Sequence, residues 1–205
     1  MKKIDLATWK RKEHFQYFTG LDDPYWSMVT ELDCTQTFRQ ARQDSASFFL
    51  SYLHKTMLAA NQIEELRTRI VGDEIVCYDR LNASVTILRE DETFGCCFIE
   101  FCEDFSKFCV DAMQQIELVK QRTGMCLEED YRLDQIHYSS IPWRSFSGLS
   151  YARQLRPQDS VPKITFGRAF QNGDNLKFSV GIQVHHGLVD GLHVARFFEA
   201  LQNIL

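Results

Sequence analysis

The chain has 205 residues, of which 44% are hydrophobic, and a formal net charge of −5 at pH 7. This length and apolar content suit one domain, residues 1–205, around a single core, and the negative charge argues against a general nucleic-acid-binding protein. The N-terminus lacks the apolar run of a signal peptide and no stretch approaches the ~20 apolar residues of a membrane helix, so we expect a soluble, cytoplasmic protein with neither a nucleic-acid nor a membrane partner.

Seven cysteines form an odd set, and their spacing contains no paired CxxC of the kind that holds zinc. We therefore expect reduced, partly buried thiols and no metal site. The seven are Cys34, Cys77, Cys96, Cys97, Cys102, Cys109 and Cys126.

Three helices are predicted in the first part of the chain. The first covers Thr8 to Phe18, and a loop follows from Gly20 to Trp26. The second is expected after a cap at Asp44 or Ser45, and the third begins at Asp104. The apolar faces of the second and third helices are formed by Phe49, Leu53, Met57 and Ala60, and by Phe105, Phe108, Ala112, Ile116 and Val119.

Short apolar and β-branched runs predict strands at residues 74–79, 84–89 and 93–101, with a turn at Gly72-Asp73 before the first of them. Residues 135–146 contain a further extended segment. Asn172-Gly173 is a type I′ hairpin signal that joins a strand near residues 163–170 to the next one. Helices interleaved with strands, plus a hairpin, indicate an α/β fold with a mixed sheet.

The strand after this hairpin contains strictly alternating apolar residues from Leu176 to Val184, the pattern of a strand buried on one face. His186 continues the apolar face and His185 continues the polar one. Burial disfavours a charged imidazole, so we expect the pKa of His186 to be lowered, which keeps it neutral as a general base must be.

A helix is predicted after Asp190 and Gly191, because apolar residues recur with helical spacing to Leu205. Asp190 is either the N-cap of this helix or part of a site, and spacing alone does not choose between the two. His186 by itself could be a hydrogen-bonded core histidine. The complete string His-His-x-x-x-Asp-Gly after an alternating strand is more specific than any one of its residues.

This string resembles the active-site motif of the chloramphenicol acetyltransferases, and more loosely those of dihydrolipoyl acyltransferase cores and peptide-synthetase condensation domains. Other segments resemble the chloramphenicol acetyltransferase family in the same order, so the resemblance extends from about Trp9 to Leu205. These segments are Trp9-Lys-Arg11-Lys-Glu13-His14-Phe15, Glu65-Leu-Arg67, Glu74-Ile-Val, Asp79, Glu92-Thr-Phe94, Pro142-Trp143 and Val194-Ala-Arg196.

The resemblance implies a CoA-dependent acyltransferase fold, a mixed sheet with packed helices, and acetyl transfer from the co-substrate acetyl-CoA to a hydroxyl of chloramphenicol or a related small molecule. His186 would accept the hydroxyl proton during attack on the thioester carbonyl and return a proton to the departing CoA thiolate. The resemblance also implies a homotrimer whose active sites lie between subunits. The 13% aromatic content fits such interfaces, although aromatic residues serve equally well in a core.

By the same resemblance, Arg11 pairs with Asp190 and fixes the turn that carries His186. Without it, Arg11 would be read as a solvated surface charge. A planar guanidinium suits a bidentate grip on a carboxylate. Three further residues match substrate-binding positions of the family, and for the two phenylalanines among them core packing is the alternative. They are Thr165, Phe94 and Phe18.

The segment after Pro142-Trp143 departs from the family. An ungapped alignment puts Gly148 where the family is expected to carry a serine that donates to the developing oxyanion, and Ser147 lies one place earlier. Loss of one such donor typically costs ~10²- to 10³-fold in turnover. Either Ser147 takes over this role or the enzyme is slow on chloramphenicol.

Three alternatives stay open from the sequence. The first is an acyltransferase with a different acceptor. The second is a catalytically weak or silent relative that binds a ligand or partner, which Gly148 favours and the intact set of His186, Asp190 and Arg11 disfavours. The third is the core of a 2-oxoacid dehydrogenase complex, but the lipoyl domain and Pro/Ala-rich linker of such chains are not found here.

Overall fold

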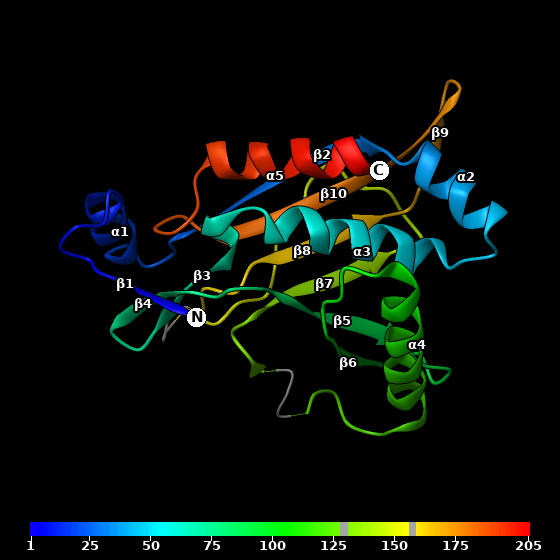
Figure 1. Ribbon diagram of the computed structural model, residues 1–205, viewed down its shortest axis with the longest axis horizontal. Helices are drawn as coiled ribbons and strands as arrows, with labels where there is room; N and C mark the ends of the chain where they lie inside the picture. Colours follow the sequence, from blue (N-terminus) through cyan, green and yellow to red (C-terminus); the bar gives the residue numbers. More distant parts are fainter. Residues whose placement is uncertain (128–130, 156–158) are drawn as a thin grey trace.

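The computed structural model describes residues 1–127, 131–155 and 159–205, and a mixed sheet runs through its centre (Figure 1). The strand order is β2-β10-β8-β7-β5-β6, with β9 paired to β10. β5, β7 and β8 are parallel to one another, whereas β2, β8 and β9 run antiparallel to β10, and β6 runs antiparallel to β5. This arrangement confirms the predicted mixed sheet. The strands are β2 (Tyr25–Asp33), β5 (Asn82–Leu88), β6 (Phe94–Ile99), β7 (Gln135–Ile141), β8 (Lys163–Gly167), β9 (Phe170–Asn172) and β10 (Asn175–His185).

A smaller antiparallel sheet has the order β1-β4-β3. It consists of β1 (Lys2–Ile4), β4 (Glu74–Cys77) and β3 (Thr68–Val71). Gly72 adopts φ +58° between β3 and β4, a conformation that glycine reaches without strain, so the predicted turn is confirmed. The predicted hairpin is also present, since β9 and β10 pair with Asn172 opposite Asn175. Its turn is not the predicted type I′, because Gly173 has φ +61° but Asp174 is not among the residues with positive φ.

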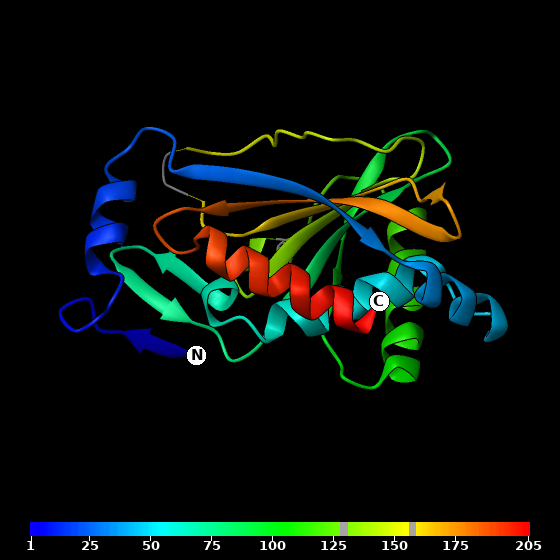
Figure 2. The same cartoon turned by 90° about the horizontal axis from the view of Figure 1, so that it is seen from above.

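Helices cover one side of the central sheet (Figure 2). Asp104 accepts a hydrogen bond from the backbone N–H of Lys107 and caps α4, as predicted. The cap expected at Asp44 or Ser45 is wrong, because Ser47 accepts from the N–H of Leu50 and starts α3. The helices are α1 (Lys12–Thr19), α2 (Thr35–Gln43), α3 (Phe48–Asn61), the 3-10 helix η1 (Glu64–Arg67), α4 (Phe105–Gln121) and α5 (Gly191–Ile204). Within the described ranges, no helix is both long and apolar enough to span a membrane.

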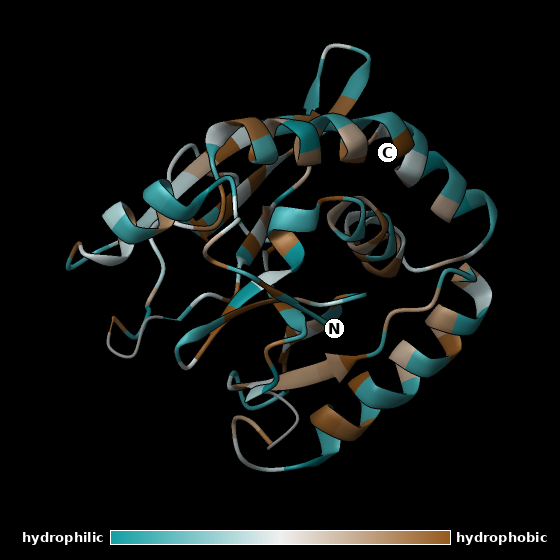
Figure 3. Ribbon diagram, turned by 60° about the vertical axis from the view of Figure 1, so that its left-hand side comes forward, coloured by the Kyte–Doolittle hydropathy of each residue, from teal (hydrophilic) through white to brown (hydrophobic). Residues whose placement is uncertain are grey.

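The core lies between this layer of helices and the sheet. The helices carry hydrophobic and hydrophilic bands (Figure 3), and fully buried side chains such as Leu53 of α3 and Phe197 of α5 pack over Ile164 and Val180 of the sheet. Burying a side chain of this size contributes about 1.5–3 kcal/mol, so the helix-covered face supplies most of the apolar stabilisation.

The opposite face of the sheet is polar. Strand register places two rows of side chains there, and the segment after β7 runs along this face (Figure 2). The rows are Gln183, Lys163, His137 and Ser84, and Gly181, Thr165, Ser139 and Thr86. Because this segment covers β10 on its second side, Ser179 and His185 are as buried as Val180 and Val184, and the predicted burial of β10 on only one face is wrong.

The expectation of seven reduced thiols is also wrong for one pair. Cys96 of β6 and Cys126, which follows α4, form a disulfide with a Cα–Cα distance of 5.0 Å. They are brought together because the N–H of Cys96 donates to the carbonyl of Met125. The other five cysteines are thiols. In the part of the chain that the structure describes, no group of three or more His, Cys, Asp or Glu side chains is arranged to hold a metal ion.

Candidate active site

The turn between β10 and α5 carries His186, and its backbone is fixed at both ends. The N–H of His186 donates to the carbonyl of Pro24 at 2.8 Å, which ties it to the segment entering β2. The N–H groups of Leu188 and Val189 both donate to the carbonyl of His185 at 3.0 Å. The turn therefore holds a defined conformation in which the strand ends at His185.

Arg11 binds Asp190 through both arms of its guanidinium. Nη1 donates to Oδ2 at 2.5 Å and Nη2 donates to Oδ1 at 2.7 Å, and Nη2 also lies 3.4 Å from the carbonyl oxygen of His186. The hydrogen bond from Arg11 lowers the pKa of Asp190, so this carboxylate is charged. The predicted bidentate pair is confirmed, and it spans nearly the whole sequence.

Asp190 is also the N-cap of α5, so the interpretation of this residue as a helix cap is confirmed. Its backbone N–H donates to Nδ1 of His193 at 2.9 Å in a capping box. The other ring nitrogen of His193 lies 3.2 Å from Oε1 of Glu65, which comes from η1. The sequence signalled Glu65 only as part of a family-like segment, and the position of His193 on α5 gave no sign of this contact.

The ring of His186 lies between two aromatic side chains. Phe18 stacks on it with ring centroids 3.8 Å apart and an interplanar angle of 9°, and the Trp26 ring lies 5.6 Å away. The Nδ1 atom is buried and has no hydrogen-bond partner, since Oδ1 of Asp190 is 3.9 Å away. The side chain as a whole is 34% exposed, so Nε2 is the nitrogen that a substrate can reach.

The expected environments of the two histidines are exchanged. His185 is 1% exposed, its Nδ1 accepts a hydrogen bond from the N–H of Gly187, and burial lowers its pKa to about 4. The alternation from Val184 stops at His185, where the strand ends, so it does not continue to His186. The prediction that burial selects His186 is therefore wrong, and the case for this residue depends on its contacts.

Thr165 lies in the middle of the polar sheet face and is 3% exposed. Its register neighbours are Gly181 on β10 and Ser139 on β7, and the hydroxyl of Ser139 is 3.1 Å from that of Thr86. The hydroxyl of Tyr151 covers Gly181, where a Cβ atom would meet it at 3.1 Å. Ser139 was missed from the sequence, although the extended segment before Pro142-Trp143 contained it.

Phe94, Ser147 and Gly148 lie elsewhere on the chain. Phe94 is 45% exposed at the start of the edge strand β6, and strand spacings put it about 20 Å along and about 20 Å across the sheet from His186. Ser147 and Gly148 are exposed in the segment after β7, and a Cβ at Gly148 would meet nothing within 4 Å. Among the predicted residues, one chain thus brings together Arg11, Phe18, His186 and Asp190, and the others remain apart from them.

Comparisons with known proteins indicate the family of the chain. A family model described as chloramphenicol acetyltransferase matches residues 1–202. The chain is 30% identical to a chloramphenicol acetyltransferase of Campylobacter coli, over 99% of this chain and 97% of the relative, and 29% identical to chloramphenicol acetyltransferase 3 of Escherichia coli, over 98% and 95%. A solved chloramphenicol acetyltransferase structure superposes with a TM-score of 0.92 at 28% identity, covering 99% of both chains.

A more distant solved structure, the dihydrolipoamide acetyltransferase of Azotobacter vinelandii, has a TM-score of 0.68 at 14% identity. It covers 94% of this chain and 86% of that one. This second likeness concerns the fold alone.

Proposed function

Because the chain belongs to the chloramphenicol acetyltransferase family, its reaction is the acetyl-CoA-dependent acetylation of chloramphenicol, and we propose that His186 is the general base of this reaction. The observation that carries the proposal is the turn itself, in which Arg11 grips Asp190 through two hydrogen bonds and places an accessible imidazole beside it. An accessible, rigidly held imidazole is what general base catalysis requires.

In the proposed step, Nε2 of His186 accepts the proton of the acceptor hydroxyl while the hydroxyl oxygen bonds to the thioester carbonyl carbon. When the carbon–sulfur bond breaks, the same nitrogen gives the proton to the leaving CoA thiolate. A base of this kind contributes ~10²- to 10⁴-fold to the rate. The stacked ring of Phe18 covers one face of the imidazole, and because Nδ1 is buried, Nε2 is the nitrogen left to meet substrate.

We assign Asp190 and Arg11 an organising role rather than a chemical one. Both carboxylate oxygens of Asp190 are bound by Arg11. Oδ1 of Asp190 lies 3.9 Å from Nδ1 of His186, which is too long for a hydrogen bond. Because the guanidinium neutralises the carboxylate, Asp190 acts on His186 mainly by fixing the turn. The family's proposed arginine–aspartate pair fits this geometry.

We assign Phe18 two roles: it lines the acceptor pocket and it orients the ring of His186. By family position it lines the acceptor pocket, and in the structure its ring lies parallel to that of His186. Stacking restricts rotation of the imidazole about its Cβ–Cγ bond, so Phe18 would keep Nε2 pointing in one direction. The indole of Trp26, 5.6 Å from the imidazole, also restricts its rotation. The indole is itself held in place, because its Nε1 donates to the carbonyl of Val189.

For the hydroxyl that donates to the oxyanion, the structure supports Ser139 over Ser147 or a serine at position 148. Ser139 is in direct register with Thr165, the residue proposed for the acceptor site, and lies on the same face of the sheet. Its hydroxyl is already oriented by Thr86 at 3.1 Å. Ser147 and Gly148 are exposed in a loop, where a donor would be less ordered and better solvated.

We further propose a homotrimer with sites between subunits. The proposal is supported by the separation of His186 from Phe94 and Thr165, since the residues match one site of the family but lie at distant parts of one sheet. A neighbouring subunit would have to bring Thr165, Ser139 and Phe94 to His186. The polar sheet face that carries Thr165 and Ser139 would then adjoin the interface, and CoA and the acceptor would bind between chains.

A thioester-cleavage assay tests the proposal. The protein is mixed with acetyl-CoA and either chloramphenicol or other hydroxylated antibiotics, and release of CoA thiol is followed. We expect release that requires chloramphenicol and disappears in a folded His186→Ala variant. Full activity in that variant would contradict the assignment of His186 as the general base. Activity only with another acceptor would indicate a different substrate. Because the turn at His186 is intact, a catalytically silent relative is not favoured.

A further inference from the structure

A buried arginine outside the turn contacts both strands that lead to it. Arg153 lies in the segment between β7 and β8, and its side chain is only 3% exposed. It shares the carboxylate of Asp159, at 3.2 Å, with Lys163, at 3.6 Å. Two cations around one carboxylate that is itself 22% exposed are not a balanced pair, and desolvating the charge of Arg153 is costly, so stability alone is a poor explanation for this arginine.

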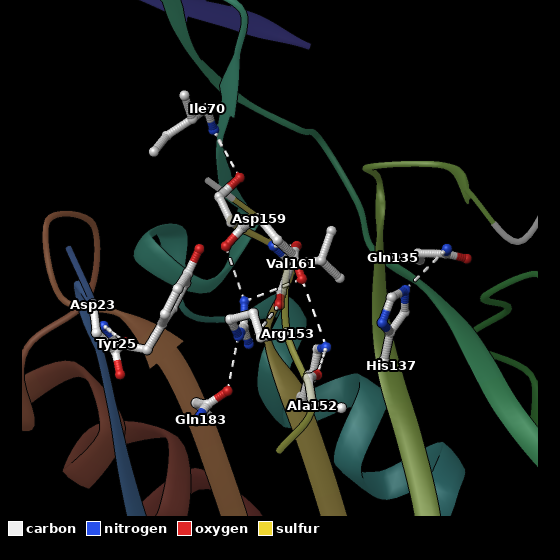
Figure 4. Close-up of polar contacts among 12 residues, drawn as sticks. Asp23, Tyr25, Ile70, Gln135, His137, Ala152, Arg153, Asp159, Val161 and Gln183 are labelled. Atoms are coloured by element: carbon white, nitrogen blue, oxygen red, sulfur yellow. Dashed lines mark hydrogen bonds and ion pairs between the residues drawn. The ribbon is translucent and has the colours of Figure 1, made fainter. Parts of the chain in front are cut away.

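The guanidinium of Arg153 is held from several directions (Figure 4). Its Nε donates to Oε1 of Gln183 on β10 at 2.8 Å. Nη1 donates to the carbonyl of Asp159 at 2.9 Å, and Nη2 donates to that of Val161 at 3.3 Å. A planar fork with five donors is suited to such a junction, whereas a lysine could not reach these acceptors together. Arg153 therefore joins the segment before β8 to the end of β10.

Arg153 also lies on the aromatic ring of Tyr25, the first residue of β2, with the guanidinium carbon 4.1 Å from the ring centroid. A cation over a desolvated tyrosine ring is an attractive contact. Tyr25 is opposite His185 in the β2–β10 register, and the two rings meet edge to face at 5.4 Å. The guanidinium thus fixes the side chain that covers His185.

A backbone hydrogen bond connects the residue before Tyr25 to His186. Pro24, which precedes Tyr25, accepts the N–H of His186 at 2.8 Å. Gln183 adds a second tie between the strands, since its Nε2 donates to Oγ of Ser27 on β2 at 3.1 Å. The start of β2 and the end of β10 are therefore tied to each other beside the turn. Arg153 contacts Tyr25, the residue of β2 that follows Pro24, and Gln183 on β10.

We propose that Arg153 is a positioning residue for His186, which it holds in place through Tyr25 and Gln183. The proposal rests on the assignment of His186 as the base. Arg153 acts at the strand ends, whereas Arg11 acts on the turn through Asp190, so two arginines from separate parts of the sequence fix the same histidine from two sides. Small displacements of a catalytic group reduce turnover strongly, and a shift of about 1 Å can cost about 10²-fold.

The test compares Arg153→Met with Arg69→Met in the full-length enzyme, using chloramphenicol and acetyl-CoA. Arg69 is the matched control, because it is fully buried and its donors bind backbone carbonyls of η1, of the start of β3 and of the segment that enters β7. In Arg153→Met we expect kcat to fall about tenfold or more, with KM values within about twofold of the parent. Arg69→Met should melt at a lower temperature with parental kcat per folded molecule.

A structural readout separates positioning from general destabilisation. In ¹⁵N-histidine-labelled protein, the ring signals of His186, assigned by their loss in His186→Ala, should shift in Arg153→Met and stay in place in Arg69→Met. Parental kcat in folded Arg153→Met, or lower kcat with unchanged His186 signals, would overturn the proposal.

Tyr25→Leu and His186→Ala distinguish a failure of the positioning role from a failure of the proposed base. If Arg153→Met does not fold, Tyr25→Leu removes the intervening ring without removing a charge, and it should lower kcat in the same way; parental kcat there would overturn the positioning role. An active His186→Ala would instead refute the base. Loss of activity in His186→Ala together with normal Arg153→Met and Tyr25→Leu would remove only the positioning role.

Discussion

The ring of Phe18 lies parallel to that of His186, with centroids 3.8 Å apart, although Phe18 belongs to α1 and His186 to the turn before α5. Replacing Phe18 by leucine keeps an apolar side chain but removes the flat surface against the imidazole. We expect kcat with chloramphenicol to fall about tenfold, because the ring of His186 gains rotational freedom. Steady-state kinetics check this, and a change confined to the KM for chloramphenicol would show that Phe18 only lines the acceptor pocket.

The two adjacent histidines should respond differently to alanine substitution. His186→Ala should abolish acetyl transfer with little change in melting temperature, since this side chain is partly exposed and Nδ1 has no hydrogen bond to lose. His185→Ala should lower the melting temperature, because it leaves a cavity at a side chain that is 1% exposed, and it should retain the larger share of activity. Thermal melts and initial rates of both variants provide the measurement. Equal activity losses in two folded variants would contradict the assignment.

Asp190→Asn should reduce both stability and turnover. The substitution leaves Arg11, whose side chain is 14% exposed, with a neutral partner in place of a carboxylate. We expect a loss of about 2 kcal/mol in the free energy of unfolding, below the 3–5 kcal/mol typical of fully buried pairs because Asp190 is 32% exposed. Urea unfolding and kcat measurements test this together. If the variant has the parental free energy of unfolding and the parental kcat, Asp190 is only a helix cap that asparagine can replace.

Substitutions at Ser139 and Gly148 distinguish two positions for the hydroxyl that donates to the oxyanion. If Ser139 donates, Ser139→Ala should lower kcat about 10²-fold with little change in KM, and Gly148→Ser should have no effect. A serine at position 148 can be accommodated, since Gly148 is not among the glycines with positive φ and has open space around it. An increase in kcat for Gly148→Ser, with normal activity in Ser139→Ala, would place the donor in the exposed loop instead.

Stability should decrease as the pH falls through the mildly acidic range. Burial lowers the pKa values of His137 and His185 to about 4, whereas an unfolded histidine titrates near 6.5. Between these values the unfolded chain binds protons that the folded chain does not, so protonation favours unfolding as the pH drops below about 6.5. We expect a loss of about 1 kcal/mol for each histidine between pH 7.5 and 5.5. Urea unfolding at both pH values tests this, and His137→Gln with His185→Gln should flatten the dependence.

The sequence by itself determined the local features of the fold. Asp104 predicted the start of α4, Gly72 the turn between β3 and β4, and the mixture of helices and strands a mixed sheet, and all three are confirmed. The cap and the turn depend on interactions within a few residues, such as a cap bonding to the N–H three positions along the chain, and the fold class follows from the order of helices and strands in the sequence. The motif from His185 to Gly191 was found in the same way, because its residues share one turn. Its pairing with Arg11 came from the family resemblance, which supplies the long-range contact that spacing does not contain.

Only the tertiary structure decided which histidine is buried and which hydroxyl faces Thr165. Alternation along β10 describes two faces of one strand, but the burial of each face depends on what covers it, and the segment after β7 covers the polar one. Ser139 meets Thr165 through strand register, and Arg153 packs on Tyr25 from the segment between β7 and β8. These contacts join residues far apart in the chain, and their formation depends on packing across the whole sheet, which no local pattern encodes.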